Sequence, residues 1–129
     1  MAESTHLKLE ILMNVELHAS RLAVSKSTQA YVERRIGFAL GRFADVIETV
    51  IVSLEDINGP RGGVDKSCRI RVNLTGQRTP IIATVLDLEV RAAVDMAAER
   101  AGRAVARQLD RRTPRRFSER WSEPLQLAE

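Results

Sequence analysis

The sequence predicts an α+β domain in which a four-stranded sheet carries two helices on one face, in the order β-α-β-β-β-α. Apolar and polar residues alternate before residue 20 and again between residues 47 and 86, as they do in strands with one buried face. Apolar residues at helical spacing mark two further segments, 26–43 and 88–111. A chain of 129 residues suits a single domain with one modest core.

The first half of the chain provides two strands with a helix between them. Alternation that continues from Leu7 to His18 predicts a single half-buried strand. Ser25 can cap the helix over residues 26–43. A segment rich in valine and isoleucine, residues 47–56, predicts the second strand. Because a helix connects them, these two strands are expected to be parallel.

The second half provides a hairpin and a long helix. After a loop over residues 58–65, a third strand alternates, so that Arg69 and Arg71 point away from its apolar side. A fourth strand over residues 81–86 follows a short turn, which predicts antiparallel pairing. The closing helix spans residues 88–111, and Pro114 prevents its continuation. We expect the face that carries the two arginines to be at least partly wet.

The composition indicates a folded cytoplasmic protein. Hydrophobic residues make up 44% of the chain and aromatic residues only 4%, so the core must be aliphatic. No apolar run approaches the roughly 18 residues of a membrane span, and the first ten residues do not form a secretory signal. The single cysteine, Cys68, cannot form an internal disulfide, which fits a reducing compartment. We expect no membrane partner.

Residues suited to catalysis or metal binding are sparse. His6 and His18 are the only histidines, and with Cys68 they give no metal-ligand spacing. Glu55 and Asp56 are adjacent on a strand and therefore face opposite sides. The sequence predicts no enzyme, no cofactor and no small-molecule substrate.

The glycine-rich loop "NGPRGGVDKS" fails the requirements of a phosphate-binding P-loop. Such a loop has glycine before its lysine and a helix after it, whereas here Asp65 precedes Lys66 and a strand follows. Pro60 also removes a backbone amide that a phosphate would need. A long hairpin loop remains, in which Arg61 and Lys66 either touch a nucleic-acid backbone or are simply solvated.

Positive charge is concentrated in the last third of the chain. The net charge is +3, yet residues 91–120 hold nine arginines and four acidic residues. Such asymmetry favours a polyanionic partner, although a solvated basic helix is the alternative. Arg100, Arg103, Arg107 and Arg111 fall within an arc of about 80° and span roughly 16 Å of helix. Arginine binds phosphate bidentately, so this stripe predicts contact with a nucleic-acid backbone, with a solvated face as the alternative.

The first helix offers a second basic patch. Arg34, Arg35 and Arg42 lie beside its apolar stripe, together with Tyr31 and Phe38. A mixture of arginines and aromatic rings can grip and stack RNA. Packing at the edge of the core is the interpretation that we favour for the two aromatic rings. Residues 113–129 form a tail that either orders on binding or packs back on the domain, and these alternatives stay open.

Three segments resemble the ribosome hibernation promoting factors, also called ribosome-associated inhibitors or subunit-interface proteins. They are "MNVELHASRLAVSKSTQAYVERRIGFALGRF", "VIVSLEDINGPRGGVDKSCRIRVNL" and "ATVLDLEVRAAVDMAAERAGRAVARQLDRR", and the resemblance extends from about residue 13 to residue 112. The loop in the second segment is similar to that of a short branch of the family. The resemblance implies a fold similar to double-stranded RNA-binding domains. It also implies binding to 16S rRNA of the small ribosomal subunit, at the channel for mRNA and tRNA, in stationary phase or stress.

The resemblance also implies which residues contact the rRNA. They are Arg34, Arg35 and Arg42 on the first helix and Arg100, Arg103, Arg107 and Arg111 on the second. Residues 1–12 precede the usual start of the family, and we expect them to extend the first strand of a domain that spans residues 1–112. Long members carry a second, dimer-forming domain, and we expect none here and a monomer off the ribosome. A general structured-RNA-binding module acting off the ribosome is the alternative function.

Overall fold

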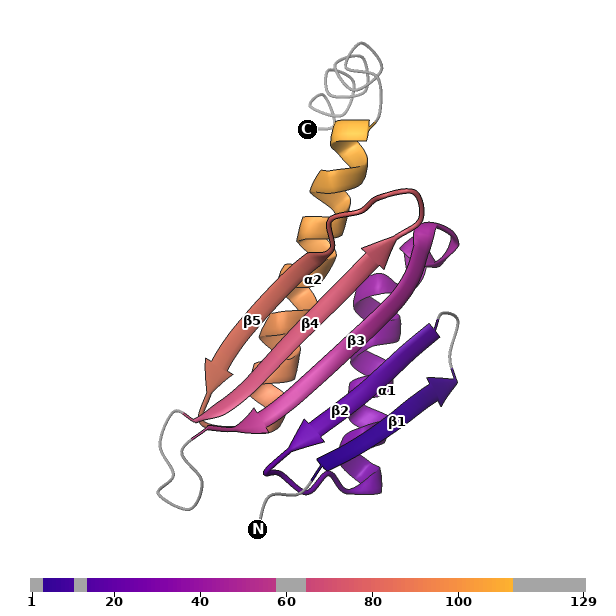
Figure 1. Ribbon diagram of the computed structural model, residues 1–129. Helices are drawn as coiled ribbons and strands as arrows, with labels where there is room; N and C mark the ends of the chain where they lie inside the picture. Colours follow the sequence, from indigo (N-terminus) through magenta and orange to yellow (C-terminus); the bar gives the residue numbers. More distant parts are fainter. Residues whose placement is uncertain (1–3, 11–13, 58–64, 113–129) are drawn as a thin grey trace.

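The computed structural model describes residues 4–10, 14–57 and 65–112, with the backbone alone for 4–10. One sheet forms a layer, and both helices pack on the same face of it, behind the sheet in Figure 1. The elements are β1 Ser4–Glu10, β2 Asn14–Ser20, α1 Lys26–Leu40, the 3₁₀ segment η1 Gly41–Val46, β3 Ile47–Asp56, β4 Lys66–Leu74, β5 Ile81–Asp87 and α2 Val90–Arg112.

The strands lie in the order β1-β2-β3-β4-β5. β2 and β3 are parallel and are joined through α1, whereas β3, β4 and β5 pair antiparallel. From β2 to α2 the chain therefore follows the predicted order β-α-β-β-β-α. The predictions of an α+β fold and of both helices on one face are confirmed.

The prediction of one strand from Leu7 to His18 is wrong. The segment contains two antiparallel strands, β1 and β2, with Leu7 opposite Leu17 and His6 opposite His18, so the sheet has five strands. The sequence Ile11-Leu12-Met13 interrupts the alternation, but alternation has the same period on both arms of a hairpin and cannot reveal the reversal. The hairpin gives β2 a hydrogen-bonded neighbour on the side away from β3.

Side-chain hydrogen bonds set the helix starts. Ser25 Oγ accepts from the Thr28 amide at 3.1 Å, which confirms the predicted cap of α1. Asp87 Oδ1 accepts from the amides of Leu88 and Glu89 at 2.6 and 3.3 Å. The first backbone hydrogen bond of α2 joins the Ala93 amide to the Glu89 carbonyl oxygen at 3.0 Å, so α2 begins at Val90 rather than at the predicted Leu88. α1 ends at Leu40 rather than at residue 43, because the chain tightens there into η1.

An aliphatic core fills the space between the sheet and the helices, as the composition predicts. Valine, leucine and isoleucine side chains of β2, β3 and β4 meet Val32, Ile36 and Leu40 of α1. α2 contributes mainly small residues, so its backbone lies close to both the sheet and α1. The buried residues of α2 are Ala93, Val94, Ala97, Ala98, Ala101, Gly102 and Val105.

Candidate nucleic-acid interface

Two hollows lie along α2, one beside α1 and the other beside η1, and together they form what we call the interhelical groove. The first has a volume of about 500 Å³. The second, of about 590 Å³, shares Arg42 with it and continues toward the carboxyl end of α2. The groove is lined by Arg35, Phe38, Ala39, Arg42, Phe43, Glu99, Gly102, Arg103, Ala106, Arg107, Leu109 and Asp110.

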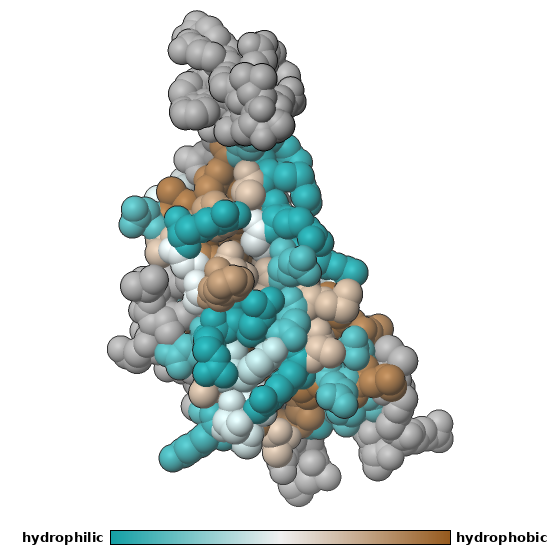
Figure 2. All heavy atoms as spheres, turned by 180° about the vertical axis from the view of Figure 1, so that it is seen from behind, coloured by the Kyte–Doolittle hydropathy of each residue, from teal (hydrophilic) through white to brown (hydrophobic). Residues whose placement is uncertain are grey.

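A third hollow separates α2 from strand β5, and we call it the edge groove. Its volume is about 370 Å³. Arg103 and Arg107 line both this groove and the interhelical groove, so they lie on the crest of α2 between the two. Figure 2, which views the helix side, shows a mainly hydrophilic surface interrupted by hydrophobic residues. The edge groove is lined by Ile82, Ala83, Thr84, Arg100, Arg103, Ala104 and Arg107.

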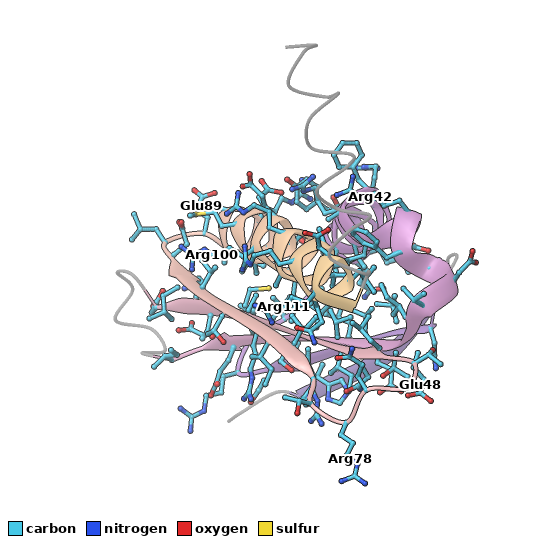
Figure 3. The ribbon with its side chains drawn as sticks, turned by 90° about the horizontal axis from the view of Figure 1, so that it is seen from above. Arg42, Glu48, Arg78, Glu89, Arg100 and Arg111 are labelled. Carbon is cyan, nitrogen blue, oxygen red and sulfur yellow. The ribbon has the colours of Figure 1, made fainter. Side chains whose placement is uncertain are left out.

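The predicted arginine stripe of α2 is exposed along its length. Arg100 Nη1 lies 3.5 Å from the carbonyl oxygen of Thr84, and Arg111 Nη1 donates to Gln108 Oε1 at 3.0 Å. Figure 3 shows Arg100 and Arg111 on the side of α2 nearer β5. Arg103 donates to Glu99 Oε2 at 3.1 Å, one turn away on the same helix. The spacing of arginines in the sequence predicted the stripe but did not identify Glu99 as the partner of Arg103.

The structure brings two of the three arginines predicted on the first helix, Arg35 of α1 and Arg42 of η1, to the same groove. Arg35 is held by Asp95 of α2, with its Nε 2.8 Å from Oδ1 and its Nη2 3.3 Å from the carbonyl oxygen. Arg42 stands 4.6 Å from the ring centre of Phe43. Arg34 is exposed, and it is not among the described residues that line the interhelical groove or the edge groove. Part of each basic patch therefore meets at the interhelical groove, namely Arg35 and Arg42 of the first patch and Arg103 and Arg107 of the second.

The two aromatic residues predicted at the core edge differ in their environment. Tyr31 packs against the core, and its hydroxyl donates to Asp95 Oδ1 at 2.5 Å. This hydrogen bond to a carboxylate raises the pKa of Tyr31, and burial raises it further. Phe38 has 82% of its surface exposed, so the prediction is confirmed for Tyr31 and wrong for Phe38. Helical spacing places Phe38 beside the apolar stripe but does not show that α2 leaves its ring uncovered.

Arg91 fixes Tyr31 from the other side. Its guanidinium lies 4.8 Å from the tyrosine ring centre, and its Nη2 donates to Ser27 Oγ at 2.7 Å. The contacts of Arg91 with Ser27 and of Arg35 with Asp95 join α1 to the amino-terminal half of α2.

The remaining predicted site residues do not join this surface. Lys66 is half-buried and pairs with Asp65 at 2.8 Å and with Asp56 at 3.5 Å. The hydrogen bond between Asp65 and Lys66 lowers the pKa of the carboxyl and raises that of the amine. Asp65 is fully buried, and its carboxylate lies beside the Lys66 amine. Arg61 lies outside the described residues, as do residues 113–129.

The opposite face of the sheet carries Arg69 and Arg71, which are exposed as predicted. No cluster of three or more histidine, cysteine, aspartate or glutamate residues suited to a metal is found in residues 14–57 and 65–111. Burial raises the pKa of Cys68 to about 12, which leaves its thiol protonated. Among the described helices, none is long and apolar enough to cross a membrane.

Comparison with known proteins identifies one family. The model of the family described as "Sigma 54 modulation protein / S30EA ribosomal protein" matches residues 15–113. This segment contains both helices and all strands from β2 onward. No curated protein matches the chain.

Two solved structures share the fold. The amino-terminal domain of Protein Y from Thermus thermophilus matches with a TM-score of 0.56 and 23% identity, over 72% of this chain and 92% of that one. A ribosomal subunit interface protein from Coxiella burnetii matches with a TM-score of 0.62 and 13% identity, over 74% of this chain and 97% of that one. At these identities the comparison establishes the architecture of the backbone.

Proposed function

The chain belongs to the Sigma 54 modulation protein / S30EA ribosomal protein family, and from this premise we propose that it is a non-catalytic inhibitor of translation. In this proposal it acts as a ribosome hibernation factor, in stationary phase or stress. It binds the small ribosomal subunit through 16S rRNA in the channel that mRNA and tRNA otherwise occupy. It works in the cytoplasm and is a monomer off the ribosome.

The observation that carries the proposal is the gathering of arginines from both helices around the interhelical groove. Arg35 comes from α1 and Arg42 from η1, which directly follows α1, whereas Arg103 and Arg107 come from α2. Arginine guanidinium groups grip phosphate oxygens through two parallel hydrogen bonds. A surface of this kind reads the path of an RNA backbone and the shape of the RNA, because phosphate contacts carry no base sequence.

The proposed inhibition is steric and electrostatic. The arginines neutralise rRNA phosphates, and the volume of the sheet and helices then excludes mRNA and tRNA from the same channel. If four to six phosphates are contacted, the logarithm of the binding constant falls with the logarithm of salt concentration at a slope of roughly −3 to −5.

Sedimentation with purified ribosomes tests the proposal. We expect the wild-type protein to travel with 30S or 70S particles and to inhibit translation in a purified system. An Arg103→Glu/Arg107→Glu variant should remain at the top of the gradient. The matched control is Arg69→Glu/Arg71→Glu, which makes the same charge change on the opposite face of the sheet and should still sediment.

Each outcome has a distinct meaning. If both variants sediment like the wild type, the protein binds ribosomes through another surface. Loss of binding in both variants would indicate a general effect of net charge rather than a site on the helices. If the wild type fails to sediment at low salt, the ribosomal proposal is wrong.

A general structured-RNA-binding module acting off the ribosome is the second candidate. The arginine-lined grooves are compatible with this second function, because arginines on a helix can contact any phosphate backbone. Competition separates the two functions. Naked duplex RNA should displace the protein from ribosomes only at a large excess if the first function holds, and at equal nucleotide concentration if the second holds.

A further inference from the structure

Phe38 is the most exposed large hydrophobic residue among those that the structure describes, with 82% of its surface accessible. It lies on α1 and lines the interhelical groove together with Arg35, Arg42 and Arg103. A bare aromatic ring among three arginines contributes little to folding, since burial is what makes such a ring stabilising. A ligand that presents both a flat apolar surface and negative charge would complement the ring and the arginines around it.

We propose that Phe38 is a binding residue that stacks on an unpaired nucleobase, so that the RNA at the interhelical groove presents a bulged or flipped-out base there. The inference rests on the proposed function for the class of ligand, which is RNA. It goes beyond that function because it assigns a role to Phe38 and specifies the local structure of the RNA.

The Phe38 ring has one neighbouring side chain that is itself fixed by hydrogen bonds. The guanidinium of Arg35 lies 5.7 Å from the Phe38 ring centre, and Arg35 is itself held by Asp95 through a 2.8 Å hydrogen bond. One side chain that supports the ring is therefore fixed before a ligand arrives, which reduces the ordering required on binding. Tyr31 and Phe43 do not offer the same opportunity, because both pack against the core.

An unpaired base suits this ring better than a continuous duplex does. In an A-form duplex the faces of the bases are covered by their neighbours, and the surface offers phosphates and 2′-hydroxyls. Only a base outside the stack can cover the exposed face of Phe38. Arg42 and Arg103 line the same hollow and can receive the phosphates on either side of that nucleotide. Its volume of about 500 Å³ is within the range of small-ligand sites.

A second copy of this chain is a poor occupant of the same groove. A two-fold symmetric contact places equal surfaces opposite each other. Arg35, Arg42 and Arg103 would then face arginines of the other copy, and only Glu99 adds negative charge to this hollow. Like charges brought together across an interface oppose association.

Two RNA hairpins that differ only by one unpaired adenosine in the stem test the proposal. Replacing that adenosine with 2-aminopurine reports stacking through loss of its fluorescence. We expect the wild type to bind the bulged hairpin roughly 5- to 100-fold more tightly than the paired one, as expected for one base stacked on an aromatic ring. Binding should also quench the fluorescence.

Three variants separate stacking from other contributions. Phe38→Ala should remove the preference and the quenching, and so should weaken binding to the bulged hairpin far more than binding to the paired one. Phe38→Trp should restore the preference and the quenching. Arg103→Glu should weaken binding to both hairpins. Because Phe38 and Arg103 are both exposed, thermal unfolding should show that all three variants fold.

The outcomes distinguish this inference from the proposed function. Stacking is excluded if the wild type shows no preference, if Phe38→Ala keeps it, or if sedimentation equilibrium shows that Phe38 mediates self-association instead. If the wild type prefers the bulged hairpin but does not sediment with ribosomes, the stacking role holds and the ribosomal function is wrong. If the wild type sediments with ribosomes but treats both hairpins alike, the ribosomal function holds and the stacking role is wrong.

Discussion

Gly102 of α2 lies so close to Ala39 of α1 that a Cβ atom at position 102 would come within 3.0 Å of the Ala39 carbonyl oxygen. Both residues line the interhelical groove. The separation of the two helices, and with it the spacing between the arginines of α1 and those of α2, therefore depends on the missing side chain at this position.

The variant Gly102→Ala should destabilise the protein. Alanine favours a helix by up to about 1 kcal/mol over glycine, but overpacking against a backbone oxygen costs about 1–3 kcal/mol, so a net loss of about 1 kcal/mol is expected. Urea unfolding measures it. Gly37→Ala is the control, because a Cβ there meets nothing within 4 Å and should stabilise α1. Equal effects of the two substitutions would contradict the role assigned to Gly102.

The cysteine provides a probe of the core. Cys68 is fully buried, and burial raises its pKa to about 12. It is the only cysteine in the sequence. Because the thiolate is the reactive form, labelling by a disulfide reagent should require unfolding. We expect slow labelling of the native protein, acceleration by urea in step with loss of structure, and immediate labelling in guanidinium. Rapid labelling without denaturant would contradict the burial of β4.

Periodicity predicted most of the fold because the alternation within each strand decides which side chains face the helices. Cys68, Ile70 and Val72 point into the core while Arg69 and Arg71 point away, as their order in the sequence requires. The same periodicity could not separate β1 from β2, because a reversal of the chain preserves alternation.

The candidate site was only partly predictable from the sequence for a different reason. Spacing along one helix identifies residues that share a face, and so it found Arg103 and Arg107 on α2. It does not report which residues of another helix lie beside them. Whether Arg42 and Arg107 line one hollow, and whether Phe38 stays exposed, depends on how α1 and η1 pack on α2. Small residues such as Ala39 and Gly102 were the available signal for that packing.

The hydrogen bond from Tyr31 to Asp95 should make stability depend on pH in the alkaline range. Its 2.5 Å contact raises the pKa of the phenol above the ordinary value of 10.0. A pKa that is higher in the folded state means that the stabilisation is fully present below pH 10.0 and is lost as pH rises through the folded value. The wild type should therefore lose stability in this range more steeply than Tyr31→Phe does.

The titration can be followed directly, because Tyr31 is the only tyrosine in the sequence. Tyrosinate absorbance should show a midpoint above 10.0 in the folded protein. Asp95→Asn should lower that midpoint, because it removes the charged acceptor that holds the proton. The control Asp110→Asn removes a charge from the exposed carboxyl end of α2 and should leave the titration midpoint of Tyr31 unchanged. An unchanged midpoint in Asp95→Asn would rule out this hydrogen bond as its cause.

The ion pair between Glu99 and Arg103 should restrain RNA binding. Both side chains are more than half exposed, with 3.1 Å between Arg103 Nη1 and Glu99 Oε2. The carboxylate competes with phosphate for the guanidinium and adds negative charge to the interhelical groove. Because exposed pairs of this kind contribute little to folding, Glu99→Gln should leave stability nearly unchanged while it strengthens binding by about 2- to 5-fold.

Titration of ribosomes or of a structured RNA at low salt measures the effect of Glu99→Gln. Glu48→Gln is the matched control, since it makes the same change at an exposed position of β3 that lies away from the helices in Figure 3. Added salt should reduce the difference between Glu99→Gln and the wild type, because screening weakens the repulsion between Glu99 and phosphate. If both variants bind with equal affinity, Glu99 acts only through net charge, and Arg103 is then not the guanidinium that receives the phosphate.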